Sequence, residues 1–104
     1  MALTRDHFET TKKMLREDSE YRVAFLGEAI NCFVSGEADV AKNLLRKYIK
    51  ATIGFDKLAK MMHKEPQAVM RMLRPSGNPS MDNLSKLLAS LRKHEGVEPR
   101  VNAG

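Results

Sequence analysis

Apolar residues recur along this chain with the spacing of an α-helix, and Gly or Pro interrupts the pattern at intervals. The spacing predicts helices over about residues 6–16, 19–35, 38–53, 55–63, 66–74 and 81–95. The segment 96–104 combines Gly, Pro and small polar residues and is predicted to fray. The pattern therefore predicts an all-α chain of five to six helices, and 104 residues suit a single domain.

The ends of the predicted helices carry residues that favour those positions. The expected N-caps are Thr4, Asp18 or Ser19, and Ser80. Gly36 and Gly54 are expected to end the second and third helices. Pro66 fits the first turn of the fifth helix, because the N–H that it lacks has no partner there in any helix.

Within each predicted helix, one face collects the apolar residues that we expect in the core. In the last two helices these are Val69, Met72, Leu73, Met81, Leu84, Leu87, Leu88 and Leu91. In the third, Leu44, Leu45, Tyr48 and Ile49 are expected to point inward, with Lys42, Arg46, Lys47 and Lys50 outside. The second helix is apolar over a wider face, typical of a central core helix or of a dimer interface, and the sequence leaves both readings open.

Charge is divided unevenly along the chain, although the total is only +5. Residues 1–40 contain five Lys and Arg against eight Asp and Glu, which gives a net charge of −3. Residues 41–104 contain thirteen Lys and Arg against five Asp and Glu, which gives +8. Such asymmetry is typical of a basic part that faces a polyanion, and charge alone leaves nucleic acid and a merely solvated surface both open.

Several classes of function find no support in the sequence. Cys32 is the single cysteine, so an intramolecular disulfide is excluded and a reduced, cytoplasmic setting is expected. We expect no signal peptide in the charged start MALTRDHFE, and no apolar run has the ~20 residues of a membrane span. We also expect no metal, no cofactor and no enzymatic activity, because His7, His63 and His94 lie far apart without paired Cys or carboxylates.

The second half of the chain has the spacing of a helix-turn-helix. Only three residues separate Met62, near the end of the fourth predicted helix, from Pro66 at the start of the fifth. In such a motif the first helix supports a second one that enters the DNA major groove. The side of the fifth helix that points away from the expected core carries Gln67, Met70, Arg71 and Arg74.

These side chains suit the recognition of base edges. Arginine binds guanine through two hydrogen bonds in the major groove, and Gln67 would pair with adenine. Met70 would contact a thymine methyl or serve only as packing. Lys57, Lys60 and Lys64 are expected at the phosphate backbone. The plainer interpretation is that Arg71 and Arg74 are ordinary solvated residues of a short helix.

The segment GFDKLAKMMHKEPQAVMRMLRPSGNPSMDNLSKLLASL resembles the Xre-type, lambda-repressor-like helix-turn-helix proteins, and most of all the addiction-module antidote proteins among them. The phrases LTRD, ATIGFDKLA and RMLRPSGNPSMDNL extend the resemblance over the chain. It implies a homodimeric antitoxin that binds an inverted-repeat operator, represses its own operon and pairs with a small basic toxin. It also implies a lambda-repressor-like domain over 38–95, with residues 1–37 as a helical extension that serves as a dimer or partner surface.

The resemblance assigns roles to individual positions. Leu58 and Ala59 match the apolar pair of the supporting helix, Val69 the buried aliphatic of the recognition helix, and Arg71 its outward basic position. The phrase GNPS, with Asn78, matches the loop before the final helix and adds Asn78 to the expected DNA-binding residues.

Three positions depart from the family pattern. His63 stands where many members have Gly in the tight turn, and Phe55 stands where repressors often carry a polar residue that contacts phosphate. Glu65, at the start of the recognition helix, favours the helix dipole but repels a phosphate. Two alternatives therefore stay open: a DNA-binding regulator without a toxin, and a helical protein-interaction module that has lost DNA binding.

Overall fold

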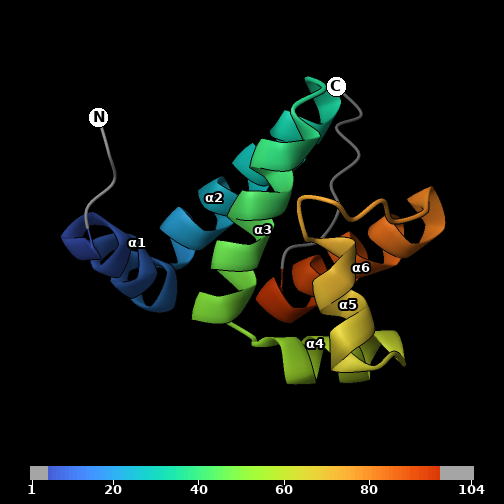
Figure 1. Ribbon diagram of the computed structural model, residues 1–104. Helices are drawn as coiled ribbons and strands as arrows, with labels where there is room; N and C mark the ends of the chain where they lie inside the picture. Colours follow the sequence, from blue (N-terminus) through green and yellow to red (C-terminus); the bar gives the residue numbers. More distant parts are fainter. Residues whose placement is uncertain (1–4, 97–104) are drawn as a thin grey trace, which may run out of the picture.

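The computed structural model describes residues 5–96, with side chains from Thr10 onward, and over that range the chain is entirely helical, without a strand (Figure 1). The helices are α1 (Arg5–Glu17), α2 (Ser19–Val34), α3 (Ala38–Ala51), α4 (Phe55–Met62), α5 (Pro66–Met72) and α6 (Met81–Glu95). The all-α prediction of five to six helices is confirmed, and the predicted bounds agree to within about two residues, the usual scatter of helix ends. The expected cap at Thr4 and the expected fraying of residues 97–104 lie outside the described range.

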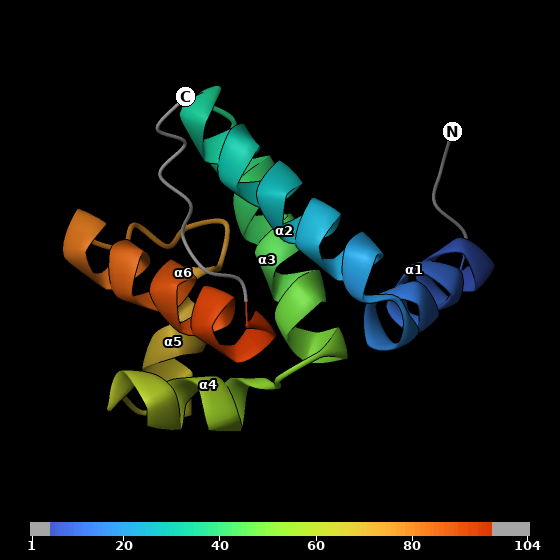
Figure 2. The same ribbon diagram turned by 180° about the vertical axis from the view of Figure 1, so that it is seen from behind.

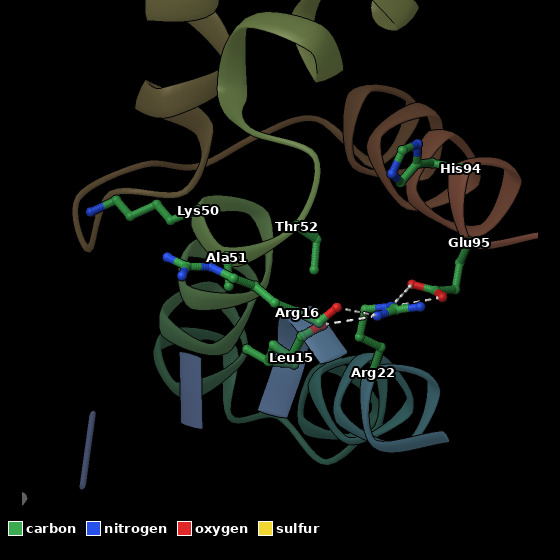
Figure 3. Close-up of a pocket in the computed structure, with 8 residues that line it drawn as sticks. All are labelled: Leu15, Arg16, Arg22, Lys50, Ala51, Thr52, His94 and Glu95. Carbon is green, nitrogen blue, oxygen red and sulfur yellow. Dashed lines mark hydrogen bonds and ion pairs between the residues drawn. The ribbon is translucent and has the colours of Figure 1, made fainter. Parts of the chain in front are cut away.

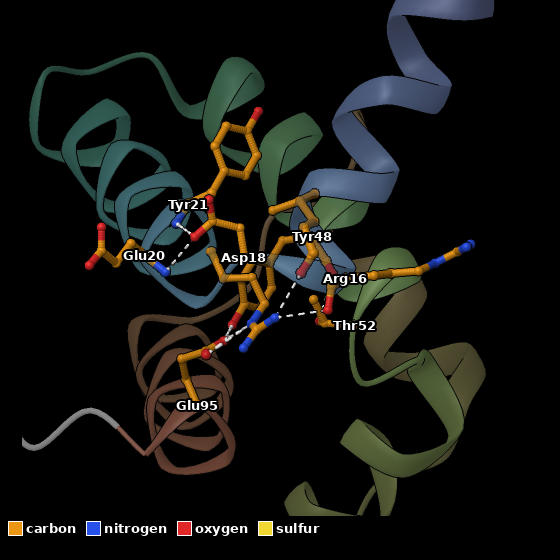
Figure 4. Close-up of polar contacts among 9 residues, drawn as sticks. Arg16, Asp18, Glu20, Tyr21, Tyr48, Thr52 and Glu95 are labelled. Carbon is orange, nitrogen blue, oxygen red and sulfur yellow. Dashed lines mark hydrogen bonds and ion pairs between the residues drawn. The ribbon is translucent and has the colours of Figure 1, made fainter.

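The helix ends in the described range form as their residues predict. The Asp18 carboxylate accepts hydrogen bonds from the backbone N–H groups of Glu20 (3.0 Å) and Tyr21 (3.1 Å), which caps α2 (Figure 4). The Ser80 hydroxyl oxygen accepts one from the N–H of Asn83 at 3.1 Å and caps α6. Gly36 follows α2 with φ +84°, a conformation that glycine adopts without steric cost.

The helices form two groups that meet at α3. Helices α2 and α3 lie antiparallel and side by side, and α1 contacts both of them (Figures 1 and 2). Helices α4, α5 and α6 gather on the other side, where α4 contacts both α5 and α6. The connection from α3 to α4 passes through Gly54, whose φ of +81° allows the chain to change direction there.

One core joins both groups, because it takes side chains from all six helices. Its members are Leu15, Leu26, Ala29, Leu45, Tyr48, Ile49, Ala51, Leu58, Ala59, Met62, Val69, Met72, Leu73, Leu87 and Leu91. The expected inward positions of α5 (Val69, Met72) and of Leu73 just after it are confirmed. Cys32 on α2 is buried as well.

The expected core stripe of α6 is wrong at its first residue. Met81 is 84% exposed, and the helix reaches the fully buried core only at Leu87. The reason is its place in the helix. Met81 directly follows the N-cap, so it projects beyond the end of the core although it shares a helical face with Leu84 and Leu88. An apolar side chain therefore stands in solvent at the start of α6.

A partly buried polar network ties the N-terminal helices to the end of α6. The Arg22 Nε donates to both carboxylate oxygens of Glu95, at 3.1 and 3.0 Å, and its Nη1 donates to the carbonyl oxygens of Leu15 and Arg16 (Figure 3). Glu95 also accepts a hydrogen bond from the Tyr48 hydroxyl. Burial and this hydrogen bond to a carboxylate raise the pKa of Tyr48 above its ordinary value, so the hydroxyl keeps its proton.

Candidate nucleic-acid interface

The turn between α4 and α5 is closed by a residue in the left-handed conformation. His63 has φ 56° and ψ 44°, and it is the one described residue other than glycine with a positive φ. Its N–H donates to the carbonyl of Lys60 at 3.2 Å, and the N–H of Lys64 donates to that of Ala59 at 2.9 Å. Histidine thus takes the conformation that glycine takes more readily, and the three residues 63–65 bring α5 against α4.

One side of helix α5 is polar and exposed to solvent, and the opposite side is buried. Gln67, Arg71 and Arg74 are exposed, whereas Val69 is fully buried. Met70 is half-buried, so it is only partly available for contact with a ligand. Pro66 occupies the first turn of α5 as expected. Gln67 and Arg71 therefore project from a short helix whose other face is fixed in the core, and Arg74 projects from the chain just after that helix ends.

A groove of about 430 Å³ brings three of the predicted residues together at the end of α5. Arg71 and Arg74 line it from α5 and the residues just after, and Asn78 lines it from the loop that follows. Gln67 and Met70 do not line this groove. The remaining lining residues are Ala68, Met72, Ser76, Gly77, Pro79, Ser80 and Asn83. The groove is thus rich in hydrogen-bond donors and carries two guanidinium groups without a carboxylate.

The lysines predicted at the phosphate backbone are distributed differently. Lys57 and Lys60 are exposed on α4, whereas Lys64, in the turn, is half-buried. Lys60 lines a second groove of about 400 Å³ between α4 and α6, together with His63 and Lys93. The sequence did not single out Lys93. Its place beside Lys60 follows from the packing of α6 on α4, which no local pattern reveals.

Two cations of α3, predicted to lie outside, instead hold the chain that follows α5. Lys42 is only 7% exposed, and its Nζ donates to the carbonyl oxygens of Pro75 (3.2 Å) and Gly77 (2.7 Å). Arg46 is half-buried, and its Nη1 donates to the carbonyl oxygen of Leu73. The expectation of an outward Lys42 is therefore wrong.

The physical reason is that the carbonyl groups at and after the end of α5 need donors once α3 covers them. The last carbonyls of any helix lack partners within the helix and carry partial negative charge, so cations satisfy them well. A signal for this role is present in the sequence: Lys42 lies three and seven residues before the buried Leu45 and Ile49, a spacing that puts it on their face.

Gly77 completes this arrangement because it packs directly against backbone. Its N–H donates to the carbonyl of Arg74 at 2.8 Å. A Cβ at this position would overlap the carbonyl oxygen of Arg71 and would lie 2.8 Å from that of Met72. Only glycine fits this approach. The loop that carries Asn78 is therefore held from both sides, by α5 and by α3.

Phe55 and Glu65, two of the three departures from the family pattern, differ in their exposure to solvent. Phe55, at the start of α4, is half-buried and packs against the core, so it does not offer a polar group to a phosphate. Glu65 is exposed as the N-cap residue of α5, and its side chain makes no capping hydrogen bond. Glu65 thus leaves a free carboxylate at the end of α5 where the helix dipole is positive.

A further cavity of about 540 Å³ lies between the end of α1, α3 and the end of α6 (Figure 3). Arg22 and Glu95, which line it, already pair with each other, while Arg16, Lys50 and His94 lie at its margin. In the part of the chain that the structure describes, no group of three or more His, Cys, Asp or Glu is placed to hold a metal ion, and no helix is long and apolar enough to cross a membrane.

In comparisons with known proteins, no family model, no curated protein and no solved structure matches this chain.

Proposed function

We propose that this protein is a sequence-specific DNA-binding transcriptional regulator of the lambda-repressor-like helix-turn-helix type. The observation that carries the proposal is the unit formed by α4, the left-handed turn at His63, and α5 with exposed Gln67 and Arg71, followed by exposed Arg74. In this unit a short helix is fixed by its apolar side and presents donors suited to base edges. The net charge of +8 in residues 41–104 supplies the attraction for a polyanion.

The regulator acts in the cytoplasm as a homodimer on an inverted-repeat operator. Dimers of helix-turn-helix proteins place their two recognition helices about one turn of DNA apart, roughly 34 Å, so a two-fold protein requires a two-fold site. By its resemblance to addiction-module antidote proteins, it is the antitoxin of a toxin–antitoxin pair and represses its own operon. Residues 1–40, with a net charge of −3, suit contact with a small basic toxin, and a gene for such a protein beside this one would support that role.

The test is a titration of the protein against the DNA upstream of its own gene, with a scrambled duplex of the same length and composition. We expect preference for the upstream DNA and a steep loss of affinity with salt, because six to ten phosphate contacts cost about 10³- to 10⁵-fold in affinity between roughly 50 and 200 mM salt. Absence of binding to any duplex at low salt would overturn the proposal.

Variants of Arg71 sharpen the test. Arg71→Ala is expected to weaken the cognate complex by about 1–3 kcal/mol and to relax preference at one base pair. Arg71→Lys keeps the charge but loses the two-pronged guanidinium, so it is expected to lose preference while it keeps the salt dependence. Lys60→Ala, as the comparison, is expected to weaken all sequences about equally. If both Arg71 variants keep the sequence preference of the wild type, Arg71 on α5 does not recognise a base.

A second candidate, a helical protein-interaction module without DNA binding, is favoured by one observation. The exposed Glu65 places a carboxylate at the start of α5, where a recognition helix approaches phosphate. Glu65→Gln separates the two candidates, because removal of this charge is expected to tighten DNA binding in a regulator. A chain that binds no DNA before or after this substitution belongs to the second candidate.

A further inference from the structure

The cavity between the ends of α1, α3 and α6 is polar and lies apart from the proposed DNA interface. Its volume of about 540 Å³ falls within the range of roughly 300–1,000 Å³ that is usual for small-molecule sites. Eight residues line it, and only Leu15 and Ala51 among them are apolar. None of the residues predicted to bind DNA belongs to this lining. The cavity therefore suits a polar ligand other than DNA.

The walls of this cavity carry more positive than negative charge. Arg16 and Lys50 are exposed and extend to one side of it, and Arg22 lies on the other side (Figure 3). Glu95 is the only acidic residue in the lining that the structure describes. Three cations against one carboxylate leave two positive charges, without counting His94, which also lines the cavity. A cavity of this charge attracts an anion.

The one carboxylate of the lining is shielded from a ligand by its own partners. Both oxygens of Glu95 accept hydrogen bonds from the Arg22 Nε, at 3.1 and 3.0 Å, and Glu95 also accepts one from the Tyr48 hydroxyl. The Glu95 side chain is only 6% exposed, whereas that of Arg22 is 22% exposed. An approaching ligand therefore meets the cations more readily than the carboxylate.

The helix ends that meet at this cavity do not account for all of its cations. Carbonyl groups at the end of a helix carry partial negative charge, which by itself favours a cation nearby. At the end of α1, however, the Arg22 Nη1 already donates to the carbonyl oxygens of Leu15 (3.2 Å) and Arg16 (3.1 Å). At the end of α3, the N–H and the hydroxyl of Thr52 donate to carbonyl oxygens of the last turn. The charges of Arg16 and Lys50 therefore remain available to a ligand.

We infer that this cavity binds a small, non-aromatic phosphate ester. A phosphate ester carries a charge of about −1.5 to −2 at pH 7, which matches the two positive charges of the lining. Arginine binds phosphate oxygens through paired hydrogen bonds, and lysine binds them as a point charge. The lining residues that the structure describes include no aromatic ring, so the base of a nucleotide would have no ring to stack on.

The test is a titration of the isotope-labelled protein with glycerol phosphate at neutral pH and constant ionic strength, followed by NMR of the backbone amides. We expect the amides of the lining residues to shift together and to saturate with a dissociation constant of about 1 mM, which is weak but specific. Glycerol, which lacks the phosphate, is the control ligand and is expected to shift none of them. Cavity amides that do not respond to about 50 mM glycerol phosphate would overturn the inference.

Variants of the two exposed cations test their part in binding. Arg16→Gln and Lys50→Gln remove the charge and keep a polar side chain. Each is expected to raise the dissociation constant about threefold, and both together about tenfold, because exposed charges contribute modestly and separately. Lys57→Gln is the matched control, since it neutralises an exposed lysine of α4 outside the cavity, and it should change nothing. A double variant that binds as tightly as Lys57→Gln would overturn the inference.

Acetate distinguishes a phosphate site from a general anion site. Its single charge balances only half of the excess positive charge of the lining, so we expect it to bind at least about tenfold more weakly than glycerol phosphate. Equal affinity for the two anions would overturn the assignment to a phosphate ester. Shifts confined to the cations of the groove at the end of α5, Arg71 and Arg74, would overturn the assignment to this cavity.

These outcomes are distinct from failure of the proposed function. A chain that binds glycerol phosphate in the cavity but binds no duplex retains the site and loses the DNA-binding proposal. A chain that prefers its upstream DNA, but whose cavity amides do not respond to glycerol phosphate, retains the proposed function and loses the site.

Discussion

The connection that precedes α5 spans residues 63–65 and is closed by its own backbone. The N–H groups of His63 and Lys64 donate to carbonyls of α4 that lie three and five residues back. The connection that follows α5 is longer, and side chains from another helix hold it. Lys42 reaches the carbonyls of Pro75 and Gly77, which lie 33 and 35 residues further along the chain.

The difference shows how the two ends of α5 acquire their positions. The first turn needs only local residues, so it forms together with α4 and α5. The second depends on α3, so the loop with Asn78 is placed only when α3 is packed against it. The groove that contains Arg71, Arg74 and Asn78 therefore depends on a helix that contributes no residue to its lining.

Gly77→Ala tests the connection that follows α5 and has the largest expected effect. The added Cβ would overlap the backbone carbonyl of Arg71, which cannot move without a shift of the end of α5. We expect a loss of about 3 kcal/mol in the free energy of unfolding, at the upper end for overpacking. Urea unfolding measures it. An alanine that costs less than about 0.5 kcal/mol would show that the loop adapts freely.

Lys42→Met removes the ammonium group and keeps most of the apolar stem. Two carbonyls then lose their donor in a largely covered place, so we expect a loss of about 2 kcal/mol. Lys50→Met is the matched control on the same helix, because Lys50 is exposed, and it should change stability by less than about 0.5 kcal/mol. Equal urea midpoints for the two variants would contradict the role of Lys42.

Lys42→Arg adds a finer comparison to the same experiment. It retains a cation at the loop, so it should recover part of the stability that Lys42→Met loses. In the DNA titration, Lys42→Met should weaken the complex although Lys42 is buried, because the loop with Asn78 loses its support. Unchanged DNA affinity would show that this loop takes no part in DNA binding.

Ser80→Ala removes the cap at the end of the same loop. The Ser80 hydroxyl satisfies the N–H of Asn83 at 3.1 Å, and loss of such a cap costs about 1 kcal/mol. Ser80→Asp restores an acceptor and should recover the stability. Thermal unfolding followed by circular dichroism compares the three chains, and an alanine variant as stable as the wild type would count against the cap.

His63→Gly tests the local turn and has the smallest expected effect, with the opposite sign. Glycine adopts the left-handed conformation without steric cost but loses more freedom on folding, so we expect a net gain of about 0.5 kcal/mol. His63→Val, with a branched side chain, should lose stability instead. If glycine destabilises the chain as valine does, the histidine side chain has a role of its own.

The sequence predicted the local features well for a physical reason. Caps and the proline of α5 depend on residues within one or two helical turns, so their signals lie within a short window. The buried side of α5 was predicted in the same way, from a spacing of three and four residues.

The features that were missed depend on contacts between distant helices. Lys42 shares a helical face with buried residues, but only the carbonyls of a loop from another part of the chain explain why a charged side chain is buried there. The pairing of Arg22 with Glu95 has no local signal at all. Met81 is the opposite kind of error, an apolar residue that was expected in the core but is exposed. Its helical face was predicted correctly, but the spacing does not show where along the helix the core ends.

The pairing of Arg22 with Glu95 also affects the order in which the molecule assembles. These residues are 73 positions apart, so their contact closes one of the longest loops in the chain, and loop closure of this size is slow compared with the pairing of neighbouring helices. During synthesis, α1, α2 and α3 emerge long before α6. The hydroxyl of Tyr48 and the guanidinium of Arg22 therefore lack their carboxylate partner until α6 has been synthesised. The polar contacts that join α2 and α3 to α6 are thus among the later ones to form.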